Sequence, residues 1–355
     1  MNVAGVTFDF LDSLIIPFIK SAVVAWALLT GFAYTTLWER KFVGRIQVRY
    51  GPNRVGPLGL LQPLADGIKL LFKEDVVPAG ADKVIFTIAP MISTVTALVA
   101  FAIIPIGPDN VTVLGHPVPL RVTNVNAGVL IYLALTSLGI YGIVLAGWAS
   151  NNKYSLLGGL RSAAQMISYE LALGLSLVGV LMIAGTLDLQ QIVTQQTQQT
   201  ALGFGFGIPN IIRQPLGFIL YLVAGLAEVN RAPFDLPEAD TELVAGYHTE
   251  YGTMRFALFY MAEYINMITV SAIASTMFLG GWAGPTFGLT AIGGIFGVFW
   301  FVVKVFLMLT LMIWLRATLP RIRYDRLMRL GWLVMLPLGI LNVLVTGAWM
   351  LAFSS

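Results

Sequence analysis

The chain has 355 residues, of which 57% are hydrophobic and only 11% are charged, with a net charge of +3. A soluble domain carries about 25% charged residues, so most of this surface must face lipid, and the small net charge gives no sign of nucleic-acid binding. The absence of cysteine excludes disulfides, cysteine-ligated iron–sulfur clusters and thiol catalysis. The two histidines, His116 and His248, fall in expected loops, which argues against a haem, and we expect no metal site.

Eight apolar segments are expected to cross the membrane as helices, because a helical span needs about 20 mainly apolar residues. The expected fold is an all-α integral membrane protein with a single membrane domain over residues 1–355. We expect no signal peptide, because the start of the chain has no basic region or cleavage site before the first span. The spans are expected near residues 13–38, 84–106, 124–148, 163–185, 214–230, 256–282, 292–315 and 330–352.

The basic residues orient these eight spans. Seventeen of the 21 lysines and arginines fall in the loops after spans 1, 3, 5 and 7, whereas the opposite side has only Lys20, Arg121 and Arg213. Because positive charge marks the cytoplasmic side, these loops are expected inside and both termini outside. The outer loop between spans 4 and 5 is rich in glutamine and is expected to be polar and without a site.

The first inner loop, residues 39–83, combines cations with turn-forming Gly and Pro. Its second half has apolar residues at helical spacing and predicts an amphipathic helix in the membrane interface. The cations fit an anchoring role, but Glu39 and Asp66 among them are expected to pair with arginines or to face a polar cavity. The apolar face of the helix comprises Leu60, Leu61, Leu64, Ile68, Leu71 and Phe72, opposite Asp66, Lys69 and Lys73.

The second informative inner loop, residues 231–255, lies in a stretch from Glu228 to Glu263 with seven of the chain's 18 acidic residues and two basic ones. Asp235, Glu238 and Glu242 are spaced to share one helix face. One interpretation is a solvated surface helix that begins with a capping box. The other is a crowded carboxylate cluster that takes up protons near neutral pH, because like charges at close range favour protonation.

Four ionisable residues fall inside the expected spans or at their ends: Glu170, Glu228, Glu263 and Lys304. A charge at the bilayer centre costs at least about 2.5–3.5 kcal/mol, and such residues usually face a bundle interior or water. Snorkelling or an isolated ion pair is one interpretation. Several buried ionisable groups at different depths favour the other, a proton path, for which Asn126 and Gln165 are candidate extensions.

Six motifs cover nearly the whole chain in order, and they resemble the membrane subunit that forms the quinone chamber of NADH:quinone oxidoreductase, respiratory complex I (the H-type subunit in bacteria, subunit 1 in mitochondria). The motifs are Glu39-Arg40-Lys41-x-x-Gly44-Arg45-x-Gln47-x-Arg49-x-Gly51-Pro52-Asn53-Arg54-x-Gly56, Leu61-Gln62-Pro63-Leu64-Ala65-Asp66, Arg161-Ser162-Ala163-Ala164-Gln165-x-Ile167-Ser168-Tyr169-Glu170, Ala227-Glu228-x-Asn230-Arg231-Ala232-Pro233-Phe234-Asp235, Phe256-Ala257-Leu258-Phe259-x-x-Ala262-Glu263-Tyr264 and Arg316-Ala317-x-x-Pro320-Arg321-x-Arg323-Tyr324-Asp325.

The resemblance implies a multi-pass subunit of the cell inner membrane that anchors the peripheral redox arm and lines a cavity for a quinone (ubiquinone, menaquinone or plastoquinone). The substrate would be reduced by FMN and iron–sulfur clusters of partner subunits, with none bound by this chain, which would be a non-redox subunit of a proton-pumping translocase. Its partners would be the quinone-site and iron–sulfur subunits of the peripheral arm, small membrane subunits, antiporter-like subunits and lipid, with no nucleic acid.

Roles for individual residues follow from the same resemblance. The inner loops 39–83 and 231–255 would form the face that docks the arm. The quinone chamber would be lined by Glu39, Arg40, Lys41, Arg45, Arg49, Asp66, Lys69 and Phe234; proton coupling would use Glu170, Glu228, Asp235, Glu238, Glu242, Glu250, Glu263 and Lys304; and Arg161, Arg231 and Arg255 would form structural ion pairs.

Three other functions compete with this interpretation. An energy-converting hydrogenase or formate hydrogenlyase has a related anchor subunit but reduces protons in place of quinone, and its co-purifying subunits would differ. A stand-alone cation-coupled transporter would be active as a lone chain in liposomes, and it would be expected to show paired broken spans, which this sequence lacks. A passive scaffold has no need for buried carboxylates, which are costly in lipid.

Overall fold

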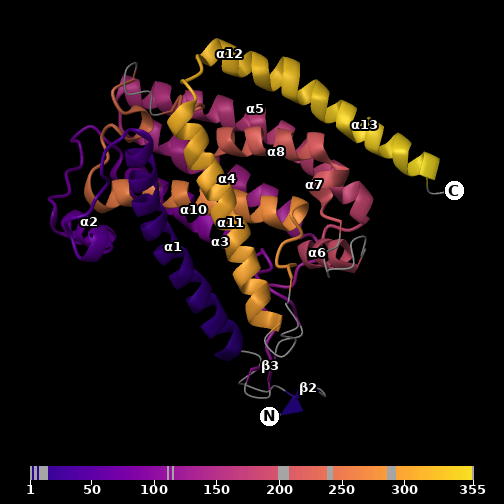
Figure 1. Ribbon diagram of the computed structural model, residues 1–355. Helices are drawn as coiled ribbons and strands as arrows, with labels where there is room; N and C mark the ends of the chain where they lie inside the picture. Colours follow the sequence, from indigo (N-terminus) through magenta and orange to yellow (C-terminus); the bar gives the residue numbers. More distant parts are fainter. Residues whose placement is uncertain are drawn as a thin grey trace.

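The structure is a computed structural model that describes residues 2–3, 6–7, 15–109, 112–113, 116–198, 208–237, 243–285 and 293–353. Its described elements are almost all helices (Figure 1). Two antiparallel pairs of two-residue strands, β1 (Asn2–Val3) with β2 (Val6–Thr7) and β3 (Thr112–Val113) with β4 (His116–Pro117), are the exceptions.

The helices follow one another as α1 (Ile16–Ile46), α2 (Gln62–Phe72), α3 (Lys83–Phe101), α4 (Gly128–Ala149), α5 (Lys153–Ala184), α6 (Leu189–Gln198), α7 (Asn210–Arg213), α8 (Pro215–Glu228), α10 (Thr253–Phe278), α11 (Gly293–Thr318), α12 (Tyr324–Arg329) and α13 (Leu336–Phe353). The 3-10 turns η2 (Pro57–Gly59) and η3 (Gly246–His248) and the π-helical stretch η5 (Leu330–Met335) complete the order.

Seven of these helical segments are long and apolar enough to cross a membrane. They correspond to seven of the eight expected spans, so the prediction of an apolar, all-helical chain is confirmed. The expected fifth span is α8, which is apolar but has only 14 residues. At 1.5 Å per residue it is about 21 Å long, less than the bilayer core of about 30 Å. The count of eight spans therefore stays a prediction.

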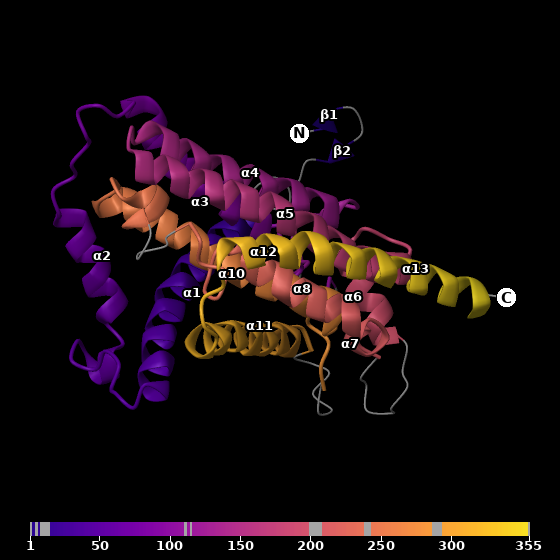
Figure 2. The ribbon, with the colours of Figure 1, turned by 90° about the horizontal axis from the view of Figure 1, so that it is seen from above.

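Helix α10 lies at the centre of the bundle, where it contacts α1, α3, α6, α8 and α11. Every residue from Tyr264 to Phe278 except Asn266 is buried, and many of them are Ala, Ser or Thr. Small side chains let helices approach closely in lipid. Around this centre α1 and α11 lie side by side, and α13 runs along α5 (Figures 1 and 2).

Helix α5 begins ten residues earlier than expected, at Lys153 instead of 163. The Asn152 side chain accepts a hydrogen bond from the Tyr154 backbone N–H at 3.0 Å, which caps the new start. The charged residues Lys153 and Arg161 made this stretch look like a loop, although a helix can extend past the bilayer into the polar region. Helix α1 is longer for the same reason and reaches Ile46.

Helices α3 and α4 cross closely at Gly142. A Cβ atom built on Gly142 would lie 2.1 Å from Ser93 Oγ and 2.8 Å from the Ala89 carbonyl oxygen. Both distances are far below van der Waals contact, so only glycine permits this crossing.

Replacing this glycine is expected to force α3 and α4 apart. Overpacking of this kind costs about 1–3 kcal/mol, so Gly142→Ala should lower the midpoint of thermal unfolding in mild detergent. The matched control is Gly174→Ala in α5, where a Cβ meets no atom within 4 Å, and alanine should be neutral or stabilising there. Equal midpoints for the two variants would contradict the close crossing.

A buried ion cluster as the candidate functional site

The first inner loop folds back onto the end of α1. A Cβ atom at Gly51 would lie 2.8 Å from Lys41 Cα, so the loop backbone is in contact with the helix at that point. Lys41 donates a hydrogen bond to the Leu58 carbonyl, and Arg40 pairs with Asp66 of α2 at 2.8 Å. Asp66 also accepts a hydrogen bond from Gln62 at 3.0 Å. The expectation that Asp66 pairs with an arginine is confirmed.

Helix α2 stands at one end of the molecule (Figure 2). None of its residues is buried. Its apolar side chains Leu64, Ile68, Leu71 and Phe72 are all exposed, as are Arg45, Arg49 and Lys69 of the expected chamber. This end of the chain therefore presents an unpartnered surface that is apolar on one face and cationic on another.

Glu39, near the end of α1 where this loop starts, is at the centre of a buried ion cluster. The residue is only 7% exposed. It accepts hydrogen bonds from Arg231 Nη1 at 3.3 Å, from Tyr264 Oη at 2.7 Å and from Arg316 Nη1. These donors come from the loop after α8, from α10 and from α11. One carboxylate on α1 thus joins three other segments.

Arg231 extends the cluster to a second carboxylate. It forms an ion pair with Glu263, and its guanidinium lies 4.3 Å from the centre of the Tyr264 ring and 5.6 Å from that of Tyr260. Burial alone would lower the pKa of Arg231, but Glu263 and, to a smaller extent, Tyr264 and Glu39 raise it well above its ordinary value. Two arginines and two glutamates therefore form a cluster with no net charge.

Gln165 of α5 holds the loop that carries Arg231. Its buried Nε2 donates to the carbonyls of Ala227 at 2.7 Å and Phe234 at 2.8 Å and contacts Asn230 Oδ1 at 3.1 Å. Asn230 in turn donates to Ser162 Oγ at 3.3 Å. Phe234 is buried against the Tyr169 ring, with centroids 5.7 Å apart. The loop is fixed on both sides of Arg231.

A second carboxylate cluster lies at the end of α8, three residues before Arg231. Glu228 is buried and is hydrogen-bonded to Thr136 of α4. Glu170 of α5 lies close enough to Glu228 to interact with it electrostatically, and it accepts a hydrogen bond from Ser137. Each of the two neighbouring acidic groups therefore contacts a hydroxyl of α4.

Among the other expected coupling residues, Glu250 and Lys304 have contacts of their own outside these two clusters. Glu250 accepts a hydrogen bond from Asn152 at 2.7 Å, and Asp235 is half-buried in the turns of residues 231–237. Lys304 donates to the carbonyls of Leu279, Gly281 and Ala283 at 2.6–2.8 Å, just beyond the end of α10. Glu238 and Glu242 lie outside the described residues, and so does the helix that was expected to present them on one face.

The expected structural arginines have different surroundings. Arg231 is in the Glu39 cluster, as described. Arg255 pairs with Asp75 at 3.4 Å, and Asp75 also accepts a hydrogen bond from Thr253 at 2.9 Å. Arg161 is half-buried in α5, beside the Ser162 that contacts Asn230.

Several residues of the site were not identified from the sequence. Arg316 looked like one of five cations in the 7–8 loop, yet it is the residue of that group that reaches Glu39. Tyr264 looked like a packing residue. Asp75, the partner of Arg255, was missed as well. Outside the site, the sequence did not identify the buried Gln196 of α6, which donates to the carbonyls of Thr276 at 3.0 Å and Met277 at 3.4 Å near the end of α10. The sequence feature that could have identified these residues was a polar side chain near an apolar stretch.

Comparison with known proteins identifies the family of this arrangement. A family model described as NADH dehydrogenase matches residues 19–347. The chain is 52% identical over 340 residues to the second H-type subunit of the NADH-quinone oxidoreductases of Geobacter metallireducens, in an alignment that covers 93% of this chain and 94% of the relative. This chain belongs to the H-subunit family of NADH-quinone oxidoreductase, respiratory complex I. Within that family it is also 53% identical over 336 residues to the H-type member from Thermomicrobium roseum (94% and 96% coverage) and 53% identical over 347 residues to the one from Deinococcus radiodurans (97% and 85% coverage).

Membership of the H-subunit family and seven apolar helices together make this a multi-pass protein of the inner membrane. In the part of the chain that the structure describes, no group of three His, Asp or Glu side chains is arranged to hold a metal ion.

Removing the Glu39 charge is expected to destabilise the fold strongly. Glu39→Gln leaves two arginines facing one carboxylate, and breaking a buried pair from one side costs about 3–5 kcal/mol. Removing Arg316 as well restores neutrality, so Glu39→Gln with Arg316→Gln should lose less than the sum of the two single changes. The measurement is heat-induced loss of the assembled complex in mild detergent.

The neighbouring residue provides the control for this double-variant cycle. Arg40→Gln breaks the half-exposed pair with Asp66, and such pairs contribute about 0–1 kcal/mol. If Glu39→Gln and Arg40→Gln cost the same, or if the Glu39 and Arg316 effects simply add, the cluster does not behave as one unit.

Proposed function

We propose that this chain forms the quinone-binding cavity of a proton-pumping NADH:quinone oxidoreductase at its junction with the peripheral arm, and that it couples quinone reduction to proton translocation. The chain is a non-redox subunit in this proposal. The quinone is its substrate, while FMN and iron–sulfur clusters belong to the arm subunits. The named relatives support the quinone enzyme over a hydrogenase anchor or a stand-alone transporter.

The observation that carries the proposal is the position of the Glu39 cluster. Glu39 lies near the end of α1, from which the first inner loop starts, and it binds Arg231 of the loop after α8 and Arg316 of α11. The 7–8 loop adds a further contact, because the Ile322 N–H donates to the Pro233 carbonyl at 3.1 Å. Any ligand charge held by the exposed cations of the first loop would act on a neutral, buried set of ion pairs that can exchange partners.

Proton coupling is proposed to follow from the short connection between the two carboxylate clusters. Glu228 and Arg231 are three residues apart in a segment that Gln165 clamps. A change in how Arg231 pairs with Glu39 or Glu263 would therefore move the backbone next to Glu228. We propose that Glu228 and Glu170 respond by taking up or releasing a proton, and that Asp235, Glu238, Glu242 and Glu250 supply the loop side of the route.

Lys304 is proposed to contribute differently from these acids. Its three carbonyl partners fix the end of α10, and α10 carries Glu263 and Tyr264 near its middle. Lys304 would therefore act on coupling by holding this helix in place. In this proposal the chamber face is on the cytoplasmic side of the membrane and both termini are on the opposite side. The apolar face of α2 lies in the membrane interface. The neighbours of the chain are the peripheral-arm subunits, the small membrane subunits and the antiporter-like subunits.

Neutralising Glu228 is expected to uncouple the enzyme. Glu228→Gln keeps the size and the Thr136 contact but cannot carry a proton, so proton translocation driven by quinone reduction should fall by about 10²-fold. Electron transfer from NADH to an artificial acceptor that bypasses the quinone should be unchanged. Both rates are measured in proteoliposomes that contain the purified complex.

Two further variants sharpen this experiment. Glu242→Gln tests the loop side of the proposed route, and Glu74→Gln, at an exposed position between α2 and α3, is the matched control and should behave as the wild type. The coupling proposal is wrong if Glu228→Gln and Glu242→Gln both retain normal quinone reduction and normal pumping.

A further inference from the structure

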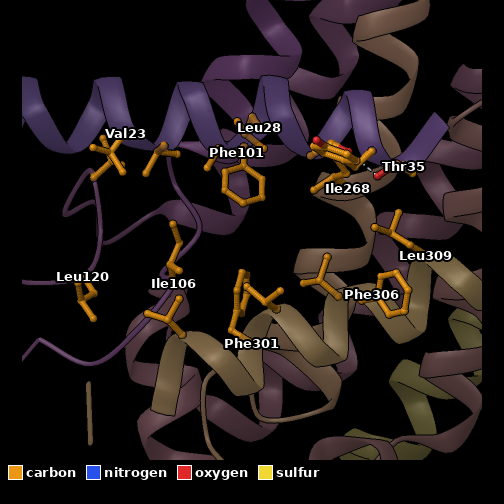
Figure 3. A pocket seen from close by; sticks show the side chains of 18 of the residues that line it. Val23, Leu28, Thr35, Phe101, Ile106, Leu120, Ile268, Phe301, Phe306 and Leu309 are labelled. Atoms are coloured by element: carbon orange, nitrogen blue, oxygen red, sulfur yellow. Dashed lines mark hydrogen bonds between the residues drawn. The ribbon is translucent and has the colours of Figure 1, made fainter. Parts of the chain in front are cut away.

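An apolar groove of about 590 Å³ runs between α1 and α11. Val23, Leu28 and Thr35 of α1 face Phe301, Phe306 and Leu309 of α11 across it, as Figure 3 shows. Phe101 of α3 and Ile268 of α10 form its floor. Nothing in the proposed quinone chemistry uses this groove, since none of the expected chamber residues lines it.

The inner end of the groove is closed by Trp38. Its indole N–H donates to Thr310 of α11 at 3.2 Å, and its ring packs against Phe306 with centroids 5.1 Å apart. Glu39 follows immediately in the sequence but faces the buried ion cluster. The groove is therefore separated from that cluster and does not continue into it.

The opposite end of the groove carries positive charge. Lys20 and Arg121 both line it there, and they are two of the three basic residues that the sequence places on this side of the membrane. The ammonium of Lys20 donates to the carbonyls of Pro119 at 3.4 Å and Arg121 at 3.3 Å, which leaves a third N–H for another acceptor. Arg121 pairs with Asp109 at 3.0 Å. These three groups together leave one net positive charge at the end of the groove.

The length and lining of the groove indicate what kind of molecule fits. From Ile19 to Trp38 it follows 19 residue steps of α1, or about 28 Å at 1.5 Å per residue. Apolar side chains line it along almost all of this length. The groove therefore suits an extended hydrocarbon chain.

We propose that this groove is a specific binding site for an anionic phospholipid, with one acyl chain between α1 and α11 and the phosphate at Lys20 and Arg121. The charged end determines the choice among lipids, because a headgroup with a net negative charge gains from the cationic end and a zwitterionic one gains little. The bound chain would fill the space that separates α1 from α11 outside Trp38 and so support the helix that carries Glu39.

The test uses the purified complex reconstituted with phospholipids that carry a photoreactive diazirine on one acyl chain. Phosphatidylglycerol and phosphatidylcholine forms of the probe are compared at equal concentration, and the labelled peptides are mapped by mass spectrometry. The expected result is labelling of α1 and α11 residues of the groove by the phosphatidylglycerol probe well above that by the phosphatidylcholine probe. Lys20→Gln and Arg121→Gln should each reduce it about fivefold, the effect of one cation on an anionic lipid surface.

Matched variants distinguish the effect of the two cations on lipid binding from the effect of the free volume in the groove. Arg213→Gln removes the third cation of the same side, which does not line the groove, and should leave labelling unchanged. Val23→Trp fills the groove without changing charge and should abolish labelling between Val23 and Trp38. Val95→Trp on α3, equally exposed but outside the groove, should not. If a complex with a charge variant fails to assemble, the comparison of Val23→Trp with Val95→Trp still tests the proposal.

Three results would overturn the proposal. Equal labelling by both lipids that ignores Lys20 and Arg121 would make the groove ordinary boundary surface. Labelling that is displaced by added quinone would assign the groove to the quinone. Absence of groove labelling in the intact complex would mean that a neighbouring subunit covers it.

Discussion

A carboxylate buried in a membrane protein must be satisfied, and Glu39 meets this constraint by drawing donors from three distant parts of the chain. Arg231, Tyr264 and Arg316 cannot all reach it unless the loop after α8, helix α10 and the end of α11 converge on α1. The inner end of the bundle is therefore organised by polar contacts, whereas its apolar centre around α10 is packed by small residues that let the helices approach closely. The polar contacts give the inner end a defined geometry. In the proposed mechanism, the same ion pairs exchange partners.

The same constraint connects the proposed roles. In the proposal, a ligand charge near this neutral cluster would shift Arg231 between its two glutamates. That shift would reach Glu228 through the segment that Gln165 clamps. Glu228 lies near Glu170 and the hydroxyls of α4. The far end of α10 is held by Lys304, so movement at Glu263 and Tyr264 is confined to the inner half of that helix. Coupling in this account is a local exchange of partners between fixed helices.

The sequence predicted the helical class, seven of the long helices and the polarity of the inner loops, because hydrophobic runs of this length have few alternatives in lipid. It also predicted that Glu39 and Asp66 pair with arginines or face a polar cavity, and the structure shows the pairing with arginines. It could not identify which arginine, since Glu39 and Arg316 are 277 positions apart and five cations in the same loop look alike. The start of α5, the buried glutamine of α6 and the carbonyl partners of Lys304 were missed for a related reason. Each depends on backbone groups left unpaired at helix ends, and these are visible only once the helices are placed.

The most direct test of coupling by partner exchange is a redox-induced infrared difference spectrum of the complex, recorded as its quinone is reduced. The account predicts a change in the carbonyl stretching band of a carboxylic acid when the quinone is reduced, and loss of that change in Glu228→Gln while the bands of the quinone itself persist. A spectrum in which the carboxylic acid bands are the same in the wild type and in Glu228→Gln would contradict the claim that this glutamate responds to quinone chemistry.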